Sequence, residues 1–138
     1  MSDKIFVDSN IFIYVLDHND EDKRQKAKNL LIEASETARI ILSTQVINEI
    51  YAVASKKLNI NPVQVKRFIS SLYDFDVIIV TREIIDAAID CSILQQINYW
   101  DALMLSAAAA GHCSVIWTED LNNHQIINGV RVVNPFVV

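Results

Sequence analysis

The sequence has few residues that interrupt secondary structure, with only two glycines and two prolines among 138 residues. It contains no low-complexity stretch and no repeated segment. Boundaries between elements must therefore be located from polar clusters and helix-capping residues. Because hydrophobic residues make up 51% of the chain and charged residues 21%, the composition excludes a disordered protein and allows a packed core.

Cysteine is equally scarce. Cys91 and Cys113 are isolated in the sequence, and neither belongs to a CxxC or CxxH motif. This spacing argues against a structural zinc site and against a framework of disulfides. We expect both thiols to be reduced and buried.

Long hydrophobic runs are also missing. Apolar stretches such as VIIV at 77–80 have the length of strands, far below the roughly 20 residues that cross a bilayer. The amino terminus, MSDKIFVDSN, carries an acid before its apolar run, which is unlike a cleavable signal peptide. We therefore expect a cytoplasmic protein with no membrane span.

Positive charge is in deficit, since the formal net charge is -5 and the pI is about 5.0. A stable nucleic-acid binder has the opposite, basic footprint. Any binding of nucleic acid must therefore depend on a small basic patch, or on metal ions that reverse the sign of an acidic pocket.

The chain does contain a regular alternation of strand-like and helix-like segments. Apolar runs typical of buried strands occupy residues 4–8, 39–43, 75–80, 113–118 and 130–134. Stripes of apolar residues predict helices around 27–34, 47–58, 62–72 and 85–89, and an alanine-rich helix over 99–110 that ends at Gly111.

This order of elements predicts an α/β fold. The length fits a single domain over residues 1–138. Strands separated by helices of this length form right-handed βαβ units. We expect a three-layer α/β/α sandwich with a central, mainly parallel sheet of four to five strands.

Four acidic residues stand beside these apolar segments. Asp8 ends the first strand, Asp120 follows the VIWT strand, and Asp101 lies in the first turn of the alanine-rich helix. Ligands of open parallel sheets bind beyond the carboxyl ends of the strands, so these three acids are expected at one edge. Glu49, one and a half turns into the helix after RIILS, can point toward the same edge.

Carboxylates gathered in this way repel one another and raise one another's pKa values. A hard divalent cation such as Mg²⁺ or Mn²⁺ relieves the repulsion and accepts oxygen ligands. Such a site suits phosphodiester hydrolysis, because the metal lowers the pKa of a bound water and neutralises charge on the leaving oxygen.

Each acid also has a purely structural interpretation. Asp8 is compatible with a helix cap, and Asp120 with a charge that complements the dipole of a helix capped by Thr118. Asp101 is compatible with the third helical position of a capping box that Asn98 opens. Glu49 is compatible with a solvated helical residue. The four positions taken together favour a site.

The motifs around these acids resemble those of the PIN-domain family, in particular the VapC-type ribonuclease toxins of type II toxin–antitoxin systems. The resemblance covers essentially the whole chain, and its weight comes from four motifs in order. They are FVDSNIFIY with its D-[ST]-N signature, STQVINEIYAV, WDALMLSAAAAG, and WTEDL followed by VNPF.

The resemblance implies that Asp8, Glu49, Asp101 and Asp120 are the catalytic acids. Asp8, Asp101 and Asp120 are then the ligands of Mg²⁺ or Mn²⁺, with Asn10 and Thr118 as supporting residues. It further implies a metal-dependent endoribonuclease, often a homodimer, that a cognate antitoxin silences. Arg82, which opens a helix after VIIV, is the candidate for a contact with an RNA phosphate.

Other functions remain open at this point. A housekeeping PIN nuclease that processes RNA without an antitoxin would carry the same acids. A phosphoacceptor module, with Asp8 phosphorylated, would also place acids at strand ends, although no DxDxT motif follows the first strand. An inactive binding module is the third alternative.

Overall fold

The computed structural model describes residues 3–137. In chain order the elements are β1 (Asp3–Val7), α1 (Ser9–Leu16), α2 (Glu21–Thr37), β2 (Ala38–Ser43), α3 (Thr44–Lys56), α4 (Pro62–Leu72), β3 (Asp76–Ile78), α5 (Arg82–Gln95), α6 (Tyr99–Ala110), β4 (Val115–Trp117), β5 (Ile126–Ile127) and β6 (Val130–Val133). The predicted alternation of strands and helices is confirmed.

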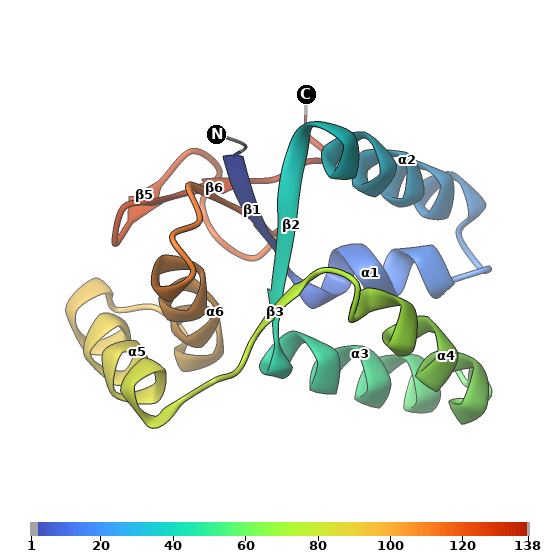
Figure 1. Ribbon diagram of the computed structural model, residues 1–138, viewed down its shortest axis with the longest axis horizontal. Helices are drawn as coiled ribbons and strands as arrows, with labels where there is room; N and C mark the ends of the chain where they lie inside the picture. The colour runs from blue at the N-terminus through green and yellow to red at the C-terminus, as the bar shows by residue number, and fades with distance from the viewer. Residues whose placement is uncertain (1–2, 138) are drawn as a thin grey trace.

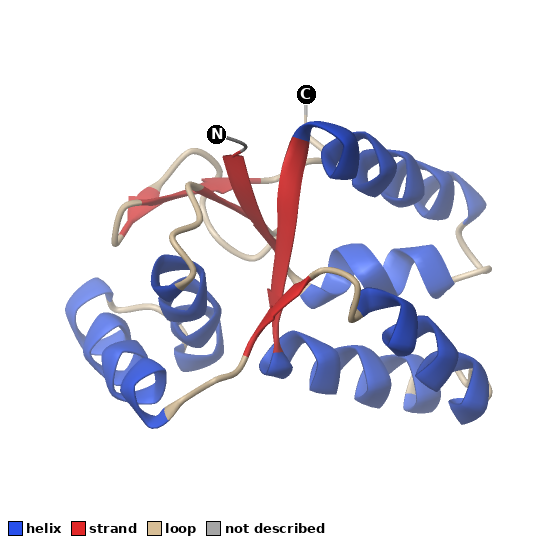
Figure 2. Ribbon diagram, in the orientation of Figure 1, coloured by secondary structure: helices blue, strands red, loops and turns tan. Residues whose placement is uncertain are grey.

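The strands form one sheet in the order β3-β2-β1-β4-β6-β5 (Figure 2). All neighbours are parallel except β5 and β6. The mainly parallel sheet is as expected, but it has six strands instead of four to five. The additional strand, β5, joins β6 through Asn128 and Gly129, whose φ angles are 53° and 79°. Positive φ at both central residues is what a two-residue hairpin turn requires.

Helices cover both faces of the sheet. In Figure 1, α5 and α6 lie together on one side of β1 and β2, and α1 to α4 lie on the other. Phe6, Ile11, Phe12, Leu42 and Ile116 are fully buried between these layers. The expected three-layer sandwich is therefore present.

Short polar residues start the helices as the sequence predicts. Asn61 accepts a hydrogen bond from the backbone N–H of Val63, directly before Pro62 at the first helical position of α4. Asn98 caps α6 in the same way, by accepting from Trp100 N–H. Each cap satisfies a backbone donor that the helix itself leaves unpaired.

Gly111 ends α6 at the expected residue but for a different physical reason. Its φ of −83° is open to any residue, and the left-handed conformation belongs to the following His112, at 59°. A Cβ at Gly111 would lie 2.5 Å from Cδ1 of Ile78. The glycine therefore provides space between α6 and β3.

Two further features concern residue types that are scarce in the sequence. Cys91 and Cys113 are both buried and unbridged, as predicted. Within residues 3–137, no helix is both long enough and apolar enough to cross a membrane.

Candidate active site

The site begins where the two central strands of the sheet end. β1 pairs with β4 so that Val7 lies opposite Trp117. The residues that follow, Asp8 and Thr118, are consequently neighbours. The backbone N–H of Asp8 donates to the Trp117 carbonyl at 3.0 Å, and the Thr118 hydroxyl donates to Asp8 Oδ2 at 2.7 Å. The register of the sheet thus joins the first and last of the four sequence motifs.

Asp8 is nearly inaccessible, with 1% of its surface exposed. It is also the N-cap of α1, because its Oδ1 accepts from the backbone N–H of Ser9 at 2.5 Å; the Ser9 hydroxyl lies 3.1 Å from the same oxygen. The capping interpretation from the sequence is therefore correct for this residue. Capping does not account for all of its bonds, since Thr118 comes from the other end of the chain.

Ser9 and Gln45 connect Asp8 to the second motif. The Ser9 hydroxyl lies 2.8 Å from Glu49 Oε2, and Gln45 Nε2 donates to Glu49 Oε1 at 2.8 Å. The same amide nitrogen donates to the backbone carbonyl of Trp100 at 3.1 Å. Glu49 is thus half-buried and held at both oxygens, which the interpretation as a solvated helical residue does not explain.

Asp101 and Asp120 complete the group of acids. Asp101 lies in the first turn of α6, directly after Trp100, and is half-buried. Asp120 is exposed, and its backbone N–H donates to Thr118 Oγ1 at 3.1 Å. Within residues 121–137 no helix follows it, so the interpretation of Asp120 as a charge at the start of a helix capped by Thr118 was wrong. In residues 3–137, no hydrogen bond to another residue involves either carboxylate.

The electrostatics show that the four acids share one environment. Burial raises the pKa of Asp8 from its ordinary 3.8 to about 6; hydrogen bonds from Thr118 and Ser9 oppose the shift, and the charges of Asp120 and Glu49 add to it. Burial also raises the pKa of Asp101, and again the charges of Asp120 and Glu49 contribute.

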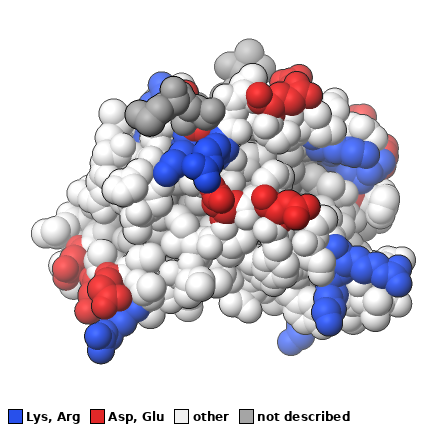
Figure 3. All heavy atoms as spheres, in the orientation of Figure 1, with Lys and Arg blue, Asp and Glu red and all other residues white. Residues whose placement is uncertain are grey.

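Within residues 3–137, no cationic side chain forms an ion pair with these acids. The ion pairs formed within the described part of the chain involve Glu21, Asp76, Glu83 and Glu119, and none of the four acids. On the face drawn in Figure 3, basic and acidic side chains are scattered between uncharged areas, without a continuous basic surface.

The remaining predicted residues, Asn10 and Arg82, form no hydrogen bond or ion pair with the four acids in the described part of the chain. Asn10 is half-buried in α1, and its side chain makes no hydrogen bond to the rest of residues 3–137. Arg82 begins α5 as expected, but its side chain is 87% exposed and pairs with Glu83 at 3.8 Å. Its contact with RNA phosphate stays a prediction.

Sequence reasoning missed a cluster beside Asp120. Tyr14 donates to Glu119 Oε1 at 2.5 Å, and Lys23 bonds Glu119 Oε2 at 3.2 Å. The Lys23 ammonium also lies 4.1 Å from the centre of the Phe136 ring. These contacts fasten the loop that carries Asp120 to α1, α2 and the carboxyl-terminal segment. The residues are far apart in the sequence, so no local pattern could have indicated them.

The free oxygen atoms of these acids determine whether the group can hold a divalent metal. Among residues 3–137, no three acidic, histidine or cysteine side chains already surround one point as ligands would. Asp8 Oδ1 accepts a hydrogen bond from the Ser9 backbone N–H and Oδ2 accepts one from Thr118, which leaves a lone pair at Oδ2. Together with the unengaged carboxylates of Asp101 and Asp120, these oxygens suit a hard cation such as Mg²⁺. The chemistry of the group fits a metal, although its atoms are not drawn together around one.

The sequence of the chain matches a known protein family. The PIN domain family profile matches residues 5–126 of the chain. The chain belongs to the PIN domain family. PIN domains are typically metal-dependent nucleases. Among curated proteins, none is similar enough in sequence to this PIN domain to count as a match.

Solved structures with a similar fold include the following three. VapC20 of Mycobacterium tuberculosis, a toxin that cleaves the sarcin–ricin loop, has a TM-score of 0.68 at 16% identity, covering 84% of this chain and 89% of that chain. A toxin–antitoxin complex from Klebsiella pneumoniae has 0.72 at 22%, covering 97% and 99%. VapBC2 from Rickettsia felis, bound to a DNA fragment from its promoter, has 0.68 at 18%, covering 94% and 96%. At these identities the comparison shows a shared fold.

The raised pKa of Asp8 predicts an unusual dependence of stability on pH. A carboxyl whose pKa is higher in the folded than in the unfolded state weakens folding as pH rises between those two values. For Asp8 that window runs from 3.8 to about 6. In a chelating buffer at about pH 7, Asp8→Asn should raise the free energy of unfolding by up to about 3 kcal/mol.

The difference between Asp8→Asn and wild type should shrink as pH falls toward about 4, where the wild-type carboxyl is protonated. Urea unfolding at several pH values measures it. A difference that stays constant from about pH 4 to 7 would contradict the raised pKa. Asp86→Asn, a change at an exposed acid of α5, serves as the control.

Proposed function

We propose that this PIN domain is a Mg²⁺-dependent endoribonuclease and the toxin of a toxin–antitoxin pair. The main support is the convergence of four acids from four segments at the carboxyl ends of β1 and β4, with no cationic side chain of residues 3–137 paired to them. Burial next to like charges is costly, and a divalent cation with a phosphodiester substrate would compensate for it.

In this proposal Asp8, Asp101 and Asp120 hold the metal, and Glu49 completes the acidic group. Thr118 and Ser9 keep the Asp8 carboxylate in a fixed orientation through their hydrogen bonds. Ser9 and Gln45 do the same for Glu49. Bound Mg²⁺ would supply positive charge for the phosphate and an acidified water for hydrolysis. Because the proposed substrate is RNA, we propose that the protein is cytoplasmic.

The alternative of a phosphoacceptor module has less support. A carboxylate that attacks phosphorus must be accessible to the whole phosphate donor. Asp8 is 1% exposed, and hydrogen bonds from Ser9 and Thr118 fix its orientation, whereas a metal ion would need only its remaining lone pair. These contacts suit a carboxylate that is held in place more than one that becomes phosphorylated.

We further propose a symmetric homodimer through the outer face of α5. Ile85, Ile89 and Ile93 follow one another at intervals of four residues and are exposed by 37%, 43% and 67%. A stripe of this kind on one helix can pack against its own copy in a twofold arrangement.

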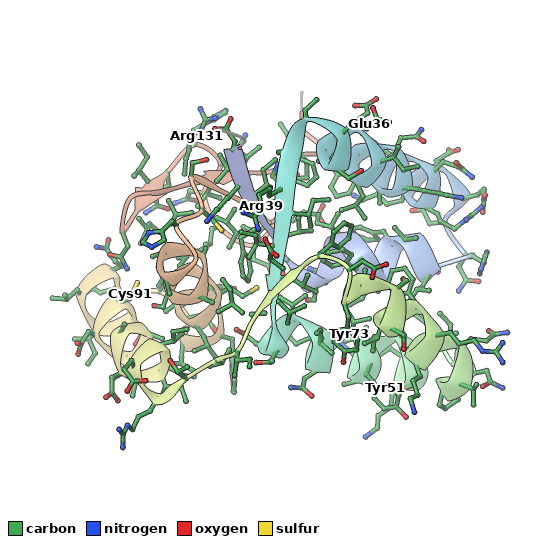
Figure 4. All side chains as sticks on the ribbon, viewed as in Figure 1. Glu36, Arg39, Tyr51, Tyr73, Cys91 and Arg131 are labelled. Carbon is green, nitrogen blue, oxygen red and sulfur yellow. The ribbon has the colours of Figure 1, made fainter. Side chains whose placement is uncertain are left out.

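A cognate antitoxin would bind a different surface, the groove between α3 and α4. This groove has a volume of about 500 Å³ and is lined by Ile47, Tyr51, Val63, Ile69 and Tyr73. Tyr51 and Tyr73 are 45% and 58% exposed and lie on α3 and at the end of α4 (Figure 4). An apolar groove between helices suits an amphipathic helical segment of a partner. Toxin–antitoxin complexes among the structures of the same fold agree with such a partner.

Substitution of single acids tests the nuclease. Asp8→Asn and Asp101→Asn should each lower the rate of RNA cleavage at least about 100-fold, because each removes a charge that the proposed metal requires. Chelation should abolish cleavage by the wild type, and Mn²⁺ or Mg²⁺ should restore it. Cleavage of total RNA by purified protein, with end mapping, provides the measurement.

Asp86→Asn, which removes an equal charge from an exposed position of α5, should cleave at the wild-type rate. Wild-type activity in Asp8→Asn or Asp101→Asn would show that these acids have been assigned wrongly. Cleavage that persists in EDTA would contradict the metal.

The dimer is tested with Ile89→Glu, which places a charge in the middle of the apolar stripe. We expect the wild type to sediment as a dimer and the variant as a monomer, because burial of an unpaired carboxylate is costly. Ile126→Glu, at a residue of β5 that is 68% exposed, is the matched control. A monomeric wild type, or a dimeric Ile89→Glu, would rule out this interface.

The antitoxin is tested with the product of a short neighbouring gene. It should inhibit cleavage by the wild type, and Tyr73→Glu should weaken its binding at least about tenfold without changing cleavage in its absence. Calorimetry and the cleavage assay provide the two readouts. If no neighbouring gene product inhibits cleavage, the protein is a housekeeping nuclease instead.

A further inference from the structure

A second cavity lies directly beside the acidic group. It has a volume of about 500 Å³, and its lining includes Gln45, Asn48, Glu49, Val80, Trp100 and Leu103. Glu49 belongs both to this cavity and to the group of acids, so the two are continuous. The size is in the usual range for a site that takes a small organic group.

Trp100 is the most unusual residue of this cavity. The side chain is 60% exposed, although tryptophan is usually well buried. It precedes Asp101 in the chain, and Tyr99 packs edge-on against it, with ring centres 5.2 Å apart and an interplanar angle of 69°. An exposed indole beside a catalytic acid offers a flat face to a ligand.

Gln45 holds the backbone of Trp100 in place relative to Glu49. Its Nε2 donates to Glu49 Oε1 and to the Trp100 carbonyl, both of which can only accept. The orientation of the amide is therefore determined, and Oε1 is left buried without a donor in residues 3–137. A buried amide oxygen is costly to leave unpaired. The nitrogen of the same amide keeps the backbone of Trp100 beside Glu49.

The chemistry of the lining defines what the cavity can bind. Among residues 3–137 no lysine or arginine lines it, whereas Glu49 does, so a phosphate is disfavoured there. Val80, Leu103 and the indole offer apolar surface for a flat ring. Asn48 uses its Nδ2 to donate to the Thr44 carbonyl, which leaves its Oδ1 as an acceptor for ring N–H groups. A neutral, planar ring with N–H donors at its edge fits these demands.

We propose that this cavity binds the nucleobase next to the scissile phosphate, with Trp100 as the stacking platform. The inference rests on the proposed ribonuclease function. Stacking on an aromatic ring accepts every base, while the acceptors at the edge of the cavity select among them. The phosphate then lies at the acids and its neighbouring base at the indole.

Fluorescence provides a direct test, because the chain has only two tryptophans. Trp117→Phe leaves Trp100 as the single reporter. In Mn²⁺, a single-stranded adenosine hexanucleotide should quench this fluorescence on mixing, before any cleavage. A hexamer of the same charge with abasic sugars should not. Absence of quenching by the adenosine hexamer overturns the proposal, whether or not the protein cleaves RNA.

Kinetics provide the second test, on an RNA whose cut site has been mapped. Trp100→Ala should raise KM roughly 5- to 150-fold, which corresponds to the usual free energy of stacking one base. Trp100→Phe should return KM most of the way to the wild-type value. An abasic nucleotide beside the cut should cost the wild type a similar factor. Combining both changes should cost little more than either alone, because they remove the same contact.

Ile126→Ala is the control, since Ile126 is a comparably exposed apolar residue of β5 that lines neither this cavity nor the α3–α4 groove. It should leave KM unchanged.

Additive effects of Trp100→Ala and the abasic nucleotide would overturn the base-binding role. A change of sedimentation in Trp100→Ala with unchanged KM would show instead that the cavity is an interface between copies. Loss of cleavage by the wild type itself would reject the nuclease and not the cavity, which the quenching experiment tests independently.

Discussion

The hydrogen bond from Thr118 to the buried carboxylate of Asp8 holds the two ends of the site together. A carboxylate with 1% exposure is costly to bury, and its pKa rises accordingly. The cost is limited by hydrogen bonds from the backbone N–H of Ser9 and the hydroxyl of Thr118. The Ser9 bond is local, but the Thr118 bond depends on the parallel pairing of β1 with β4, so the geometry of the site depends on the register of the sheet.

A continuous chain of hydrogen bonds extends from this pair. It runs from Thr118 through Asp8, Ser9, Glu49 and Gln45 to the Trp100 carbonyl. The chain crosses the ends of β4, α1, α3 and α6, which carry the four motifs. Asp101 and Asp120 stand beside the chain without a hydrogen-bonding partner in residues 3–137. This division suits a site in which some acids are held by the protein and others remain available to a cation.

Much of the fold could be predicted from local patterns. The strand-like runs, the caps at Asn61 and Asn98 and the end of α6 at Gly111 follow from residue type and spacing. β5 was missed although Asn128 and Gly129 between apolar residues are a recognised hairpin signal, because a strand of two residues is too short for periodicity to detect. The space that Gly111 leaves for Ile78 could not be predicted, since it depends on how α6 meets β3.

The sequence by itself determined which residues stand at strand ends and helix starts, and therefore which acids could meet. Chemical identity and local spacing are enough for that, because the periodicities of strands and helices are local properties. Only the tertiary structure decided that Thr118 bonds Asp8, that Gln45 ties Glu49 to Trp100, and that Glu119 fastens the loop of Asp120 to α1. Apart from the local bond between Gln45 and Glu49, those contacts join residues 55 to 110 positions apart, so they depend on how distant elements pack together.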